Sequence, residues 1–264
     1  MLVGLLILQS FQGVAQKNKL PFEPGEKILY GAYFNWYFLW INAGDVLFQC
    51  DTSPYRNQKA WHLKAQGKTH KSYDRFYTVR DTFESFLSYP KFEPLWFRRV
   101  INHGEDHSRH EYDFYPDKKI IDFRINRGKE QPVTGRVPWS NDVHDLLSCA
   151  YSFRGLDFER MKEGQKVTFE ALIDDTAETL FFRYLGMETI ETRNDRAFRC
   201  HKVSVWLVEG DFFPEGEYMK VWFTADQNRL PVMVETKILV GSVKAVLLNE
   251  QRLKYPLTSE IKVK

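Results

Sequence analysis

Residues 59–67 read KAWHLKAQG, and apolar and polar side chains alternate one by one along this stretch. In an extended chain Trp61, Leu63 and Ala65 share one face, and polar side chains take the other. A period of two is typical of an antiparallel strand that packs one face on a core and turns the other to solvent. The same alternation returns at residues 119–125, 201–208 and 218–224. These stretches predict a protein built from half-buried antiparallel strands.

Turn residues separate these runs at the spacing that hairpins need. Examples are YPDK at 115–118, PEG at 214–216 and DQN at 226–228. Proline and glycine suit the dihedral angles of tight corners, and Asp and Asn bond to the local backbone there. About a dozen strands spaced in this way indicate an all-β, mainly antiparallel fold. We expect a curved sheet, as a half-barrel or a β-roll.

One segment breaks the alternation. Residues 138–155 read PWSNDVHDLLSCAYSFRG and predict a central helix over 141–153, with Ser140 or Asn141 as its cap and Gly155 at its end. Its apolar stripe is Val143, Leu146, Leu147, Ala150 and Phe153. We expect this helix to fill part of the curved sheet.

The composition limits the classes of function. The chain has 264 residues, and 37 Lys and Arg stand against 35 Asp and Glu, a balance that gives no support for nucleic-acid binding. No glycine-rich phosphate loop and no paired-cysteine zinc motif occurs, so we expect no cofactor and no metal. The three cysteines, Cys50, Cys149 and Cys200, can be buried singly, or two of them can pair. We interpret them as buried thiols.

The first residues resemble an export signal. Residues 1–16 read MLVGLLILQSFQGVAQ, with an apolar run and small residues before a cleavage point after Ala15. The run is shorter than the about 20 apolar residues that span a bilayer, and no later stretch qualifies. A buried first strand or an N-terminal anchor is the alternative. We expect a signal peptide at 1–15, a single β domain at 16–264 without a transmembrane segment, and a periplasmic or otherwise exported location.

Short motifs in a fixed order carry a family resemblance. They are FEPGEKILY at 22–30, AGD at 43–45, DTFESF at 81–86, DVHDLLS at 142–148, VWFTAD at 221–226 and RLPV at 229–232. Their order and spacing resemble the DUF3108 family of exported bacterial proteins, over roughly residues 22–250. The resemblance implies a secreted, mostly β protein of unknown function and transfers no catalytic residue. By fold alone it is comparable with half-barrel lipoprotein carriers, which hold acyl chains in a concave sheet.

A histidine-rich stretch, INHGEDHSRHE at 101–111, holds three histidines and three carboxylates. Such side chains can bind zinc, but the spacing is not that of a helical HExxH motif. We interpret the stretch as the solvated tip of a hairpin between strands at 95–101 and 109–115.

Two carboxylates, Asp81 and Glu84, lie three positions apart in an expected strand and therefore face opposite sides. An inward carboxylate needs an arginine or several hydrogen-bond donors, and Arg98, Arg99 and Arg154 are candidate partners. The pair is either a set of structural salt bridges or a polar spot that contacts a ligand.

The expected helix carries a polar strip at three-residue spacing: Asp145, Ser148, Tyr151 and Arg154. The strip either faces a cleft beneath the helix or ties the helix to the sheet.

Aromatic residues make up 16% of the chain, with 21 Phe, 13 Tyr and 7 Trp. Such rings fill β cores, but in a half-open sheet they can also line an apolar hollow for lipid tails or sugars. The candidate ligand-binding residues are Asp81, Glu84, Arg98, Asp145, Ser148, Tyr151, Arg154 and Trp222.

The leading hypothesis is a non-enzymatic envelope protein that binds an amphiphilic or glycan ligand in an aromatic-lined concavity. One alternative is a hydrolase or lyase acting on envelope polysaccharide or lipid, which requires carboxylates to converge in one cleft. Another is a structural partner of an outer-membrane protein assembly, which a broad exposed apolar patch without a pocket would favour.

Overall fold

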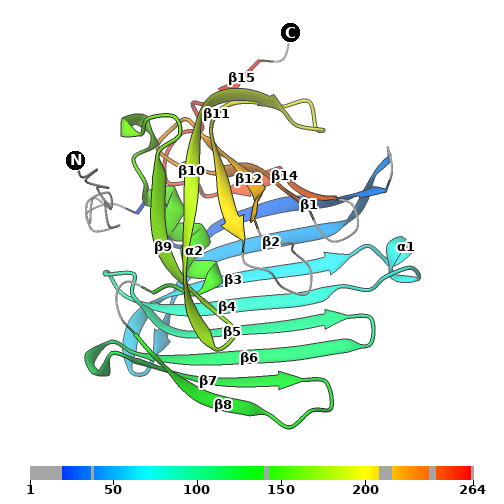
Figure 1. The fold of residues 1–264 in the computed structure, drawn as a ribbon. Coiled ribbons are helices and arrows are strands. Elements are labelled where there is room, and N and C mark those ends of the chain that lie inside the picture. Colours follow the sequence, from blue (N-terminus) through cyan, green and yellow to red (C-terminus); the bar gives the residue numbers. More distant parts are fainter. Residues whose placement is uncertain (1–19, 37–38, 140–142, 208–215, 238–241, 263–264) are drawn as a thin grey trace, which may run out of the picture.

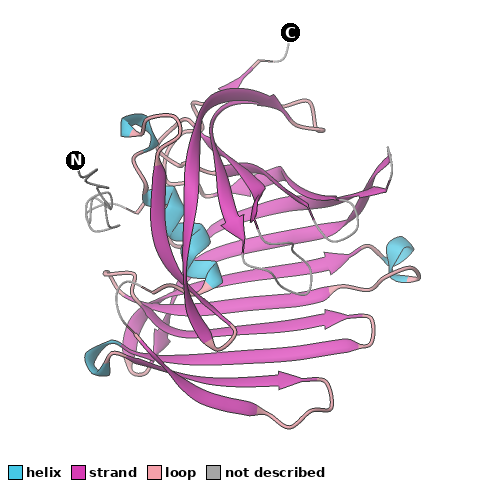
Figure 2. Ribbon diagram, in the orientation of Figure 1, coloured by secondary structure: helices cyan, strands magenta, loops and turns pink. Residues whose placement is uncertain are grey.

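The computed structural model describes residues 20–36, 39–139, 143–207, 216–237 and 242–262. Within them the chain forms one antiparallel sheet of fifteen strands, shown in Figures 1 and 2. The first eight strands are β1 Glu26–Trp36, β2 Leu39–Tyr55, β3 Gln58–Thr69, β4 Arg80–Ser88, β5 Pro94–His103, β6 Asp106–Tyr115, β7 Ile120–Arg127 and β8 Val133–Pro138. The others are β9 Lys166–Ile173, β10 Thr176–Glu191, β11 Ala197–Leu207, β12 Gly216–Thr224, β13 Pro231–Lys237, β14 Ser242–Gln251 and β15 Glu260–Ile261.

The sheet curls around an interior but does not close. Its strand order is β8-β7-β6-β5-β4-β3-β2-β1-β14-β13-β12-β11-β10-β9, with β15 added at β11. Most neighbours are successive strands, and the join between the first and last parts of the chain is the pairing of β1 with β14. The all-β, mainly antiparallel, curved sheet that the alternation predicted is confirmed. The signal peptide expected at 1–15 lies outside the described residues.

The alternating stretches form the strands that they predicted. The stretch 59–67 lies in β3, where Trp61, Leu63 and Ala65 are buried. The hairpin expected around the histidine-rich stretch is also present, as β5 and β6.

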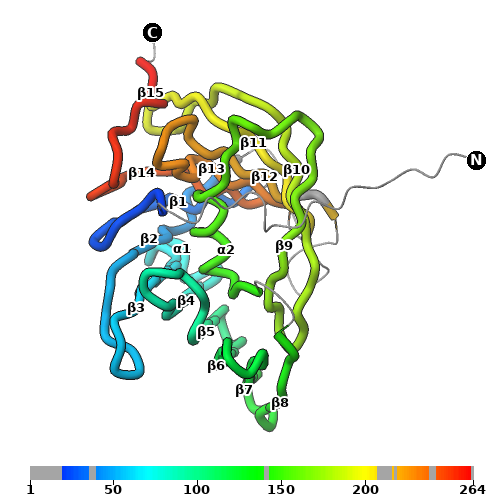
Figure 3. The backbone as a smooth tube through the Cα atoms, turned by 90° about the vertical axis from the view of Figure 1, so that its left-hand side faces the viewer, coloured from blue at the N-terminus to red at the C-terminus, as the bar shows by residue number. Residues whose placement is uncertain are grey.

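The helices within the described ranges are few and short. They are α1 Lys71–Asp74 and α2 Leu146–Ser152, with single 3₁₀ turns at Pro116–Lys118, Phe153–Gly155 and Phe158–Arg160. In Figure 3, α2 lies inside the curve, between β9 on one side and β3 to β5 on the other. This confirms a central helix that occupies part of the curved sheet.

The helix starts later than the predicted position 141, and the predicted caps Ser140 and Asn141 lie outside the described residues. Asp145 is the N-cap, and its carboxylate accepts hydrogen bonds from the backbone N–H groups of Leu147 and Ser148. The cause is a tertiary one: His144 is extended and pairs with Ala171 of β9 through a parallel bridge. The backbone of His144 therefore forms hydrogen bonds with the edge strand β9 instead of adding a turn to the helix.

Candidate functional site

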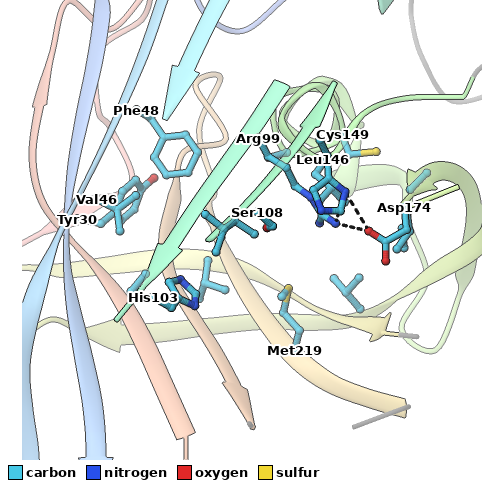
Figure 4. Close-up of a pocket in the computed structure, with 18 of the residues that line it drawn as sticks. Tyr30, Val46, Phe48, Arg99, His103, Ser108, Leu146, Cys149, Asp174 and Met219 are labelled. Atoms are coloured by element: carbon cyan, nitrogen blue, oxygen red, sulfur yellow. Dashed lines mark hydrogen bonds and ion pairs between the residues drawn. The ribbon is translucent and has the colours of Figure 1, made fainter. Parts of the chain in front are cut away.

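The hollow of the curved sheet holds a cavity of about 1390 Å³. Pockets for small ligands commonly measure about 300–1,000 Å³, so this one is large. Side chains of β1, β2, β5, β6 and β9 to β14 line it together with α2, and Figure 4 shows part of this lining. Apolar residues dominate the walls, among them Val46, Phe48, Leu146, Phe169, Val205, Met219, Val221, Phe223, Val234 and Ala245.

Single strands pass from packed core to hollow along one face. On β5, Phe97 belongs to the main core cluster, whereas Arg99 and Ile101, two and four positions later, line the cavity. On β2, Cys50 packs in the same cluster and Phe48 lines the cavity. Side chains two apart share a face of a strand. The cavity is therefore a continuation of the core in which side chains stop short of filling the space.

The helix forms the wall between the two regions. Leu147 and Tyr151 pack in the main core cluster, which also holds Trp61, Leu87 and Phe114. Leu146, Cys149, Ala150 and Phe153 of the helix and the turn that follows it line the cavity. Because a helix turns every 3.6 residues, these two sets centre on different faces of one short helix, and Tyr151 contributes to the cavity lining as well as to the core. The helix therefore packs on the core with one face and lines the hollow with the other.

Polar side chains gather at the tip of the hairpin that β5 and β6 form. This tip contributes His103, Glu105, Asp106 and His107 to the lining. The turn between β7 and β8 adds residues 127–130, which include Arg127 and Lys129. The cavity thus joins apolar walls to a rim of both charges, which is the arrangement that an amphiphilic molecule requires.

A charged clasp crosses the gap between the two ends of the sheet. Asp174, at the tip of the β9–β10 hairpin, accepts a hydrogen bond from Arg99 Nη2 of β5. Its carboxylate also lies 3.3 Å from Nδ1 of His110 on β6 and 3.5 Å from Nη2 of Arg127 on β7. Dashed lines in Figure 4 mark contacts of this group. All four residues line the cavity.

Contacts within this clasp and burial together set the pKa values of its titratable groups. Contact with His110, and then the charge of Arg99, hold the pKa of Asp174 below its usual range. Burial lowers the pKa of His110, which favours a neutral ring at neutral pH. The clasp therefore consists of a carboxylate and two guanidinium groups beside a neutral imidazole. The pairs span residues far apart in sequence, 75 positions for Arg99 and Asp174, so no sequence spacing could have identified them.

Asp81 and Glu84 face opposite sides of β4, as their spacing predicted. Asp81 accepts a hydrogen bond from the backbone N–H of Asn102 at 3.1 Å and lies 2.8 Å from His103 Nε2. Glu84 accepts a hydrogen bond of 2.6 Å from Arg98 and contacts His62 at 2.7 Å. Neither carboxylate lines the cavity, and neither does Arg98.

Asp145 and Ser148 join the helix to the sheet. Asp145 is fully buried and accepts a 2.7 Å hydrogen bond from the hydroxyl of Ser85 on β4. Burial raises the pKa of Asp145 by desolvating its carboxylate. Its Oδ2 atom has no hydrogen-bond partner among the described residues. The Ser148 hydroxyl donates to the Asp145 backbone carbonyl at 3.0 Å. Neither side chain lines the cavity.

Arg154 forms a buried ion pair with Glu26 of β1. Two hydrogen bonds join the guanidinium to the carboxylate, at 2.6 and 2.9 Å, and a third runs from Nε to the carbonyl of Asn228. Arg154 is 2% exposed and Glu26 0%. Although burial works against the charge, the carboxylate outweighs it and raises the pKa of Arg154. Arg154 and Tyr151 are the two predicted candidates that contribute to the cavity lining.

Trp222 alternates with Val221 and Phe223, which line the cavity, so its side chain lies on the other face of β12. Its indole donates a 2.8 Å hydrogen bond to Glu188. The eight predicted candidates are therefore spread over both faces of the sheet. The ligand-binding role assigned to them stays a prediction.

The cysteines and the candidate metal ligands of the described residues are the other groups that the sequence suggested for chemistry. Cys50, Cys149 and Cys200 are buried, unpaired thiols, and burial raises the pKa of each. No cluster of three or more His, Cys, Asp or Glu side chains in the described ranges is arranged to hold a metal ion. None of the helices placed in the structure has the length and apolarity to cross a bilayer.

Comparison with known proteins agrees with this fold. No curated protein matches the chain. A solved structure, the beta-barrel-like protein of the domain of unknown function DUF1849 from Brucella abortus, superposes with a TM-score of 0.57 at 8% identity, covering 88% of this chain and 100% of that one. At such low identity the likeness shows a shared fold and leaves the activity open. The model of the family described as protein of unknown function DUF3108 matches residues 30–248. By this match, which spans most of the sequence, the chain belongs to the DUF3108 family.

Proposed function

We propose that the protein binds an amphiphilic, lipid-like molecule, with an apolar chain inside the curved sheet and a polar head at the rim. The observation that carries the proposal is a cavity of about 1390 Å³ with apolar walls and a charged rim. Burial of acyl chains against such walls is favourable by about 0.8 kcal/mol for each CH₂ group removed from water.

The chemistry of the walls favours a lipid over a glycan. Val205, Val221 and Val234 cannot hydrogen-bond to sugar hydroxyls through their side chains. A buried hydroxyl without a partner costs about 1–3 kcal/mol, so a sugar inside these walls would lose affinity.

The two alternatives find less support. A hydrolase or lyase needs carboxylates that converge on a substrate. Asp81 and Glu84 lie on opposite faces of β4, and the carboxylate of Asp145 is occupied as the N-cap of α2. A purely structural partner of an outer-membrane assembly would not need a cavity of this size.

We also propose that the protein works after export, in the periplasm. The support is the signal-like pattern of residues 1–16. Sequencing the N-terminus of the protein from periplasmic and cytoplasmic fractions tests this. We expect Gln16 as the first residue in the periplasmic fraction, and an intact Met1 in the cytoplasm alone would contradict it.

The binding proposal is tested with cis-parinaric acid, a fatty acid that fluoresces when it enters an apolar site. Ala245 lines the cavity from β14, so Ala245→Trp places a large ring in the hollow. Its neighbour Lys244 lies on the other face of the same strand, which makes Lys244→Trp the matched control.

We expect saturable binding in the wild type and in Lys244→Trp, and at least tenfold weaker binding in Ala245→Trp. Mass spectrometry of solvent extracts from the purified protein then identifies any natural ligand. Absence of uptake from both cis-parinaric acid and envelope lipid extracts would contradict the proposal, as would equal binding by the two tryptophan variants.

A further inference from the structure

The connection between β3 and β4 presents an aromatic tip to solvent. It contains α1 and two exposed rings, Phe76 with 69% of its surface accessible and Tyr77 with 44%. Phe76 is the most exposed large apolar residue in the described part of the chain. A single exposed leucine needs no explanation, but a largely exposed phenylalanine next to a second exposed ring is a candidate interaction surface.

The tip is held in place by hydrogen bonds. The carboxylate of Asp74 accepts a 2.6 Å hydrogen bond from Arg80 of β4, and the Asp74 carbonyl accepts one of 3.1 Å from Thr78. The Thr78 carbonyl in turn accepts a 2.9 Å hydrogen bond from the backbone N–H of Gly104, in the β5–β6 turn. Phe76 is therefore exposed in a connection that is anchored on both sides.

Exposed basic side chains lie in and next to the connection. Lys68, Lys71 and Arg75 are exposed, and no ion pair joins any of them to a carboxylate in the described ranges. The guanidinium of Arg75 lies 5.0 Å from the centre of the Phe76 ring. The one carboxylate inside the connection, Asp74, is neutralised by Arg80. An aromatic ring among basic side chains suits the surface of an anionic bilayer, where the ring enters the headgroup boundary and the cations meet lipid phosphates.

The tip adjoins the rim of the cavity. Tyr77 contributes to the cavity lining, and its ring centre lies 5.9 Å from that of His103, at the end of β5. Tyr77 also faces the carboxylates of Asp81 and Asp106, which raise its pKa after the larger effect of burial. In Figure 1, α1 lies on the same side of the sheet as the β5–β6 and β7–β8 turns. Asp106 and Asp81 thus lie near Tyr77, which lines the cavity, whereas the exposed Lys68, Lys71 and Arg75 do not contribute to the lining.

We propose that the β3–β4 connection docks the protein on an anionic lipid bilayer through Phe76, Lys71 and Arg75, with the cavity rim next to the membrane surface. This surface goes beyond the binding of a ligand, and vesicle association can be measured with an empty cavity. Inserting one phenylalanine ring removes apolar surface that is worth about 1.5–3 kcal/mol when fully buried, which corresponds to roughly a tenfold effect or more on partitioning.

Co-sedimentation with vesicles of phosphatidylcholine alone, or with added phosphatidylglycerol, tests the proposal on the full chain. We expect the wild type to bind the anionic vesicles, with weaker binding as salt rises. Phe76→Ser should reduce binding about tenfold, and Lys71→Glu with Arg75→Glu should abolish the preference for phosphatidylglycerol. The matched control is Met187→Ser: Met187 is 55% exposed on β10 and does not line the cavity.

Three results would overturn the docking proposal: no binding of the wild type to anionic vesicles, equal binding by Phe76→Ser, or an equal loss in Met187→Ser. Uptake of cis-parinaric acid from solution separates this proposal from the proposed function. Phe76→Ser should take up the fatty acid as the wild type does. Vesicle binding without any fatty-acid uptake would leave the docking surface standing and remove the ligand-binding function.

Discussion

Removing one partner of the buried Arg154–Glu26 pair should destabilise the fold strongly. In Arg154→Met the Glu26 carboxylate, which is 0% exposed, loses both of its charged hydrogen bonds. Truncating one side of a buried ion pair costs about 3–5 kcal/mol, and the bond to the Asn228 carbonyl adds about 1 kcal/mol. For a domain of this size each kcal/mol shifts the midpoint of thermal unfolding by about 2–4 °C. We therefore expect a fall of about 8–24 °C.

Urea unfolding followed by tryptophan fluorescence measures this loss, and a double-mutant cycle isolates the pair. Glu26→Leu should be as damaging as Arg154→Met, whereas the double variant should be at least as stable as either single one, because it leaves no unpaired buried charge. Arg98→Met is the control: it breaks the partly exposed pair with Glu84 and should cost about 1 kcal/mol or less.

A loss below about 1 kcal/mol in Arg154→Met would refute this reasoning. Normal stability together with lost binding of cis-parinaric acid would instead identify Arg154 as a ligand contact. The second outcome matters because Arg154 lines the cavity as well as pairing with Glu26.

Three further predictions concern polar side chains in the core and in the Asp174 clasp. Asp145→Asn should stay within about 1 kcal/mol of the wild type in urea unfolding, because the amide oxygen keeps the cap without a buried charge, whereas Asp145→Ala should lose about 1–3 kcal/mol. Burial lowers the pKa of His110 and of His201, so the unfolded chain binds protons before the folded protein does as the pH falls below about 6.5. The free energy of unfolding should therefore fall below that pH by at most about 1.4 kcal/mol per pH unit for each ring. An unchanged free energy of unfolding between pH 7 and 5 would contradict this. Asp174→Ala should lower the free energy of unfolding by about 1–2 kcal/mol, because it leaves Arg99 without its carboxylate. Stopped-flow displacement of cis-parinaric acid should show faster release from this variant, and an unchanged release rate would contradict the prediction.

The repeating part of the fold could be predicted because it is local. Alternation at Trp61, Leu63 and Ala65 marks one strand wherever that strand lies in the sheet, and the hairpin turns follow from neighbouring residues. The helix α2 starts at Leu146, later than predicted, because the pairing of His144 with Ala171 keeps the preceding backbone out of the helix. That pairing depends on the position of β9, which local sequence does not specify.

The site was harder to predict than the fold. The polar strip on the helix was visible, and Arg154 was recognised as needing a partner, but its carboxylate lies 128 positions away in Glu26. The cavity itself has no sequence signature. Phe97 and Arg99 differ by two positions on one face of β5, and only the three-dimensional arrangement shows that one meets the core and the other the hollow.

The unclosed seam between β8 and β9 has a mechanical consequence. A barrel whose strands all pair has a circumference fixed by its hydrogen-bond ladder. Here the ladder stops at β8 and at β9, and the Asp174 clasp joins the β9–β10 hairpin to β5, β6 and β7 through side chains alone. We therefore expect the width of the hollow on this side to change by side-chain adjustment, with every strand pair intact.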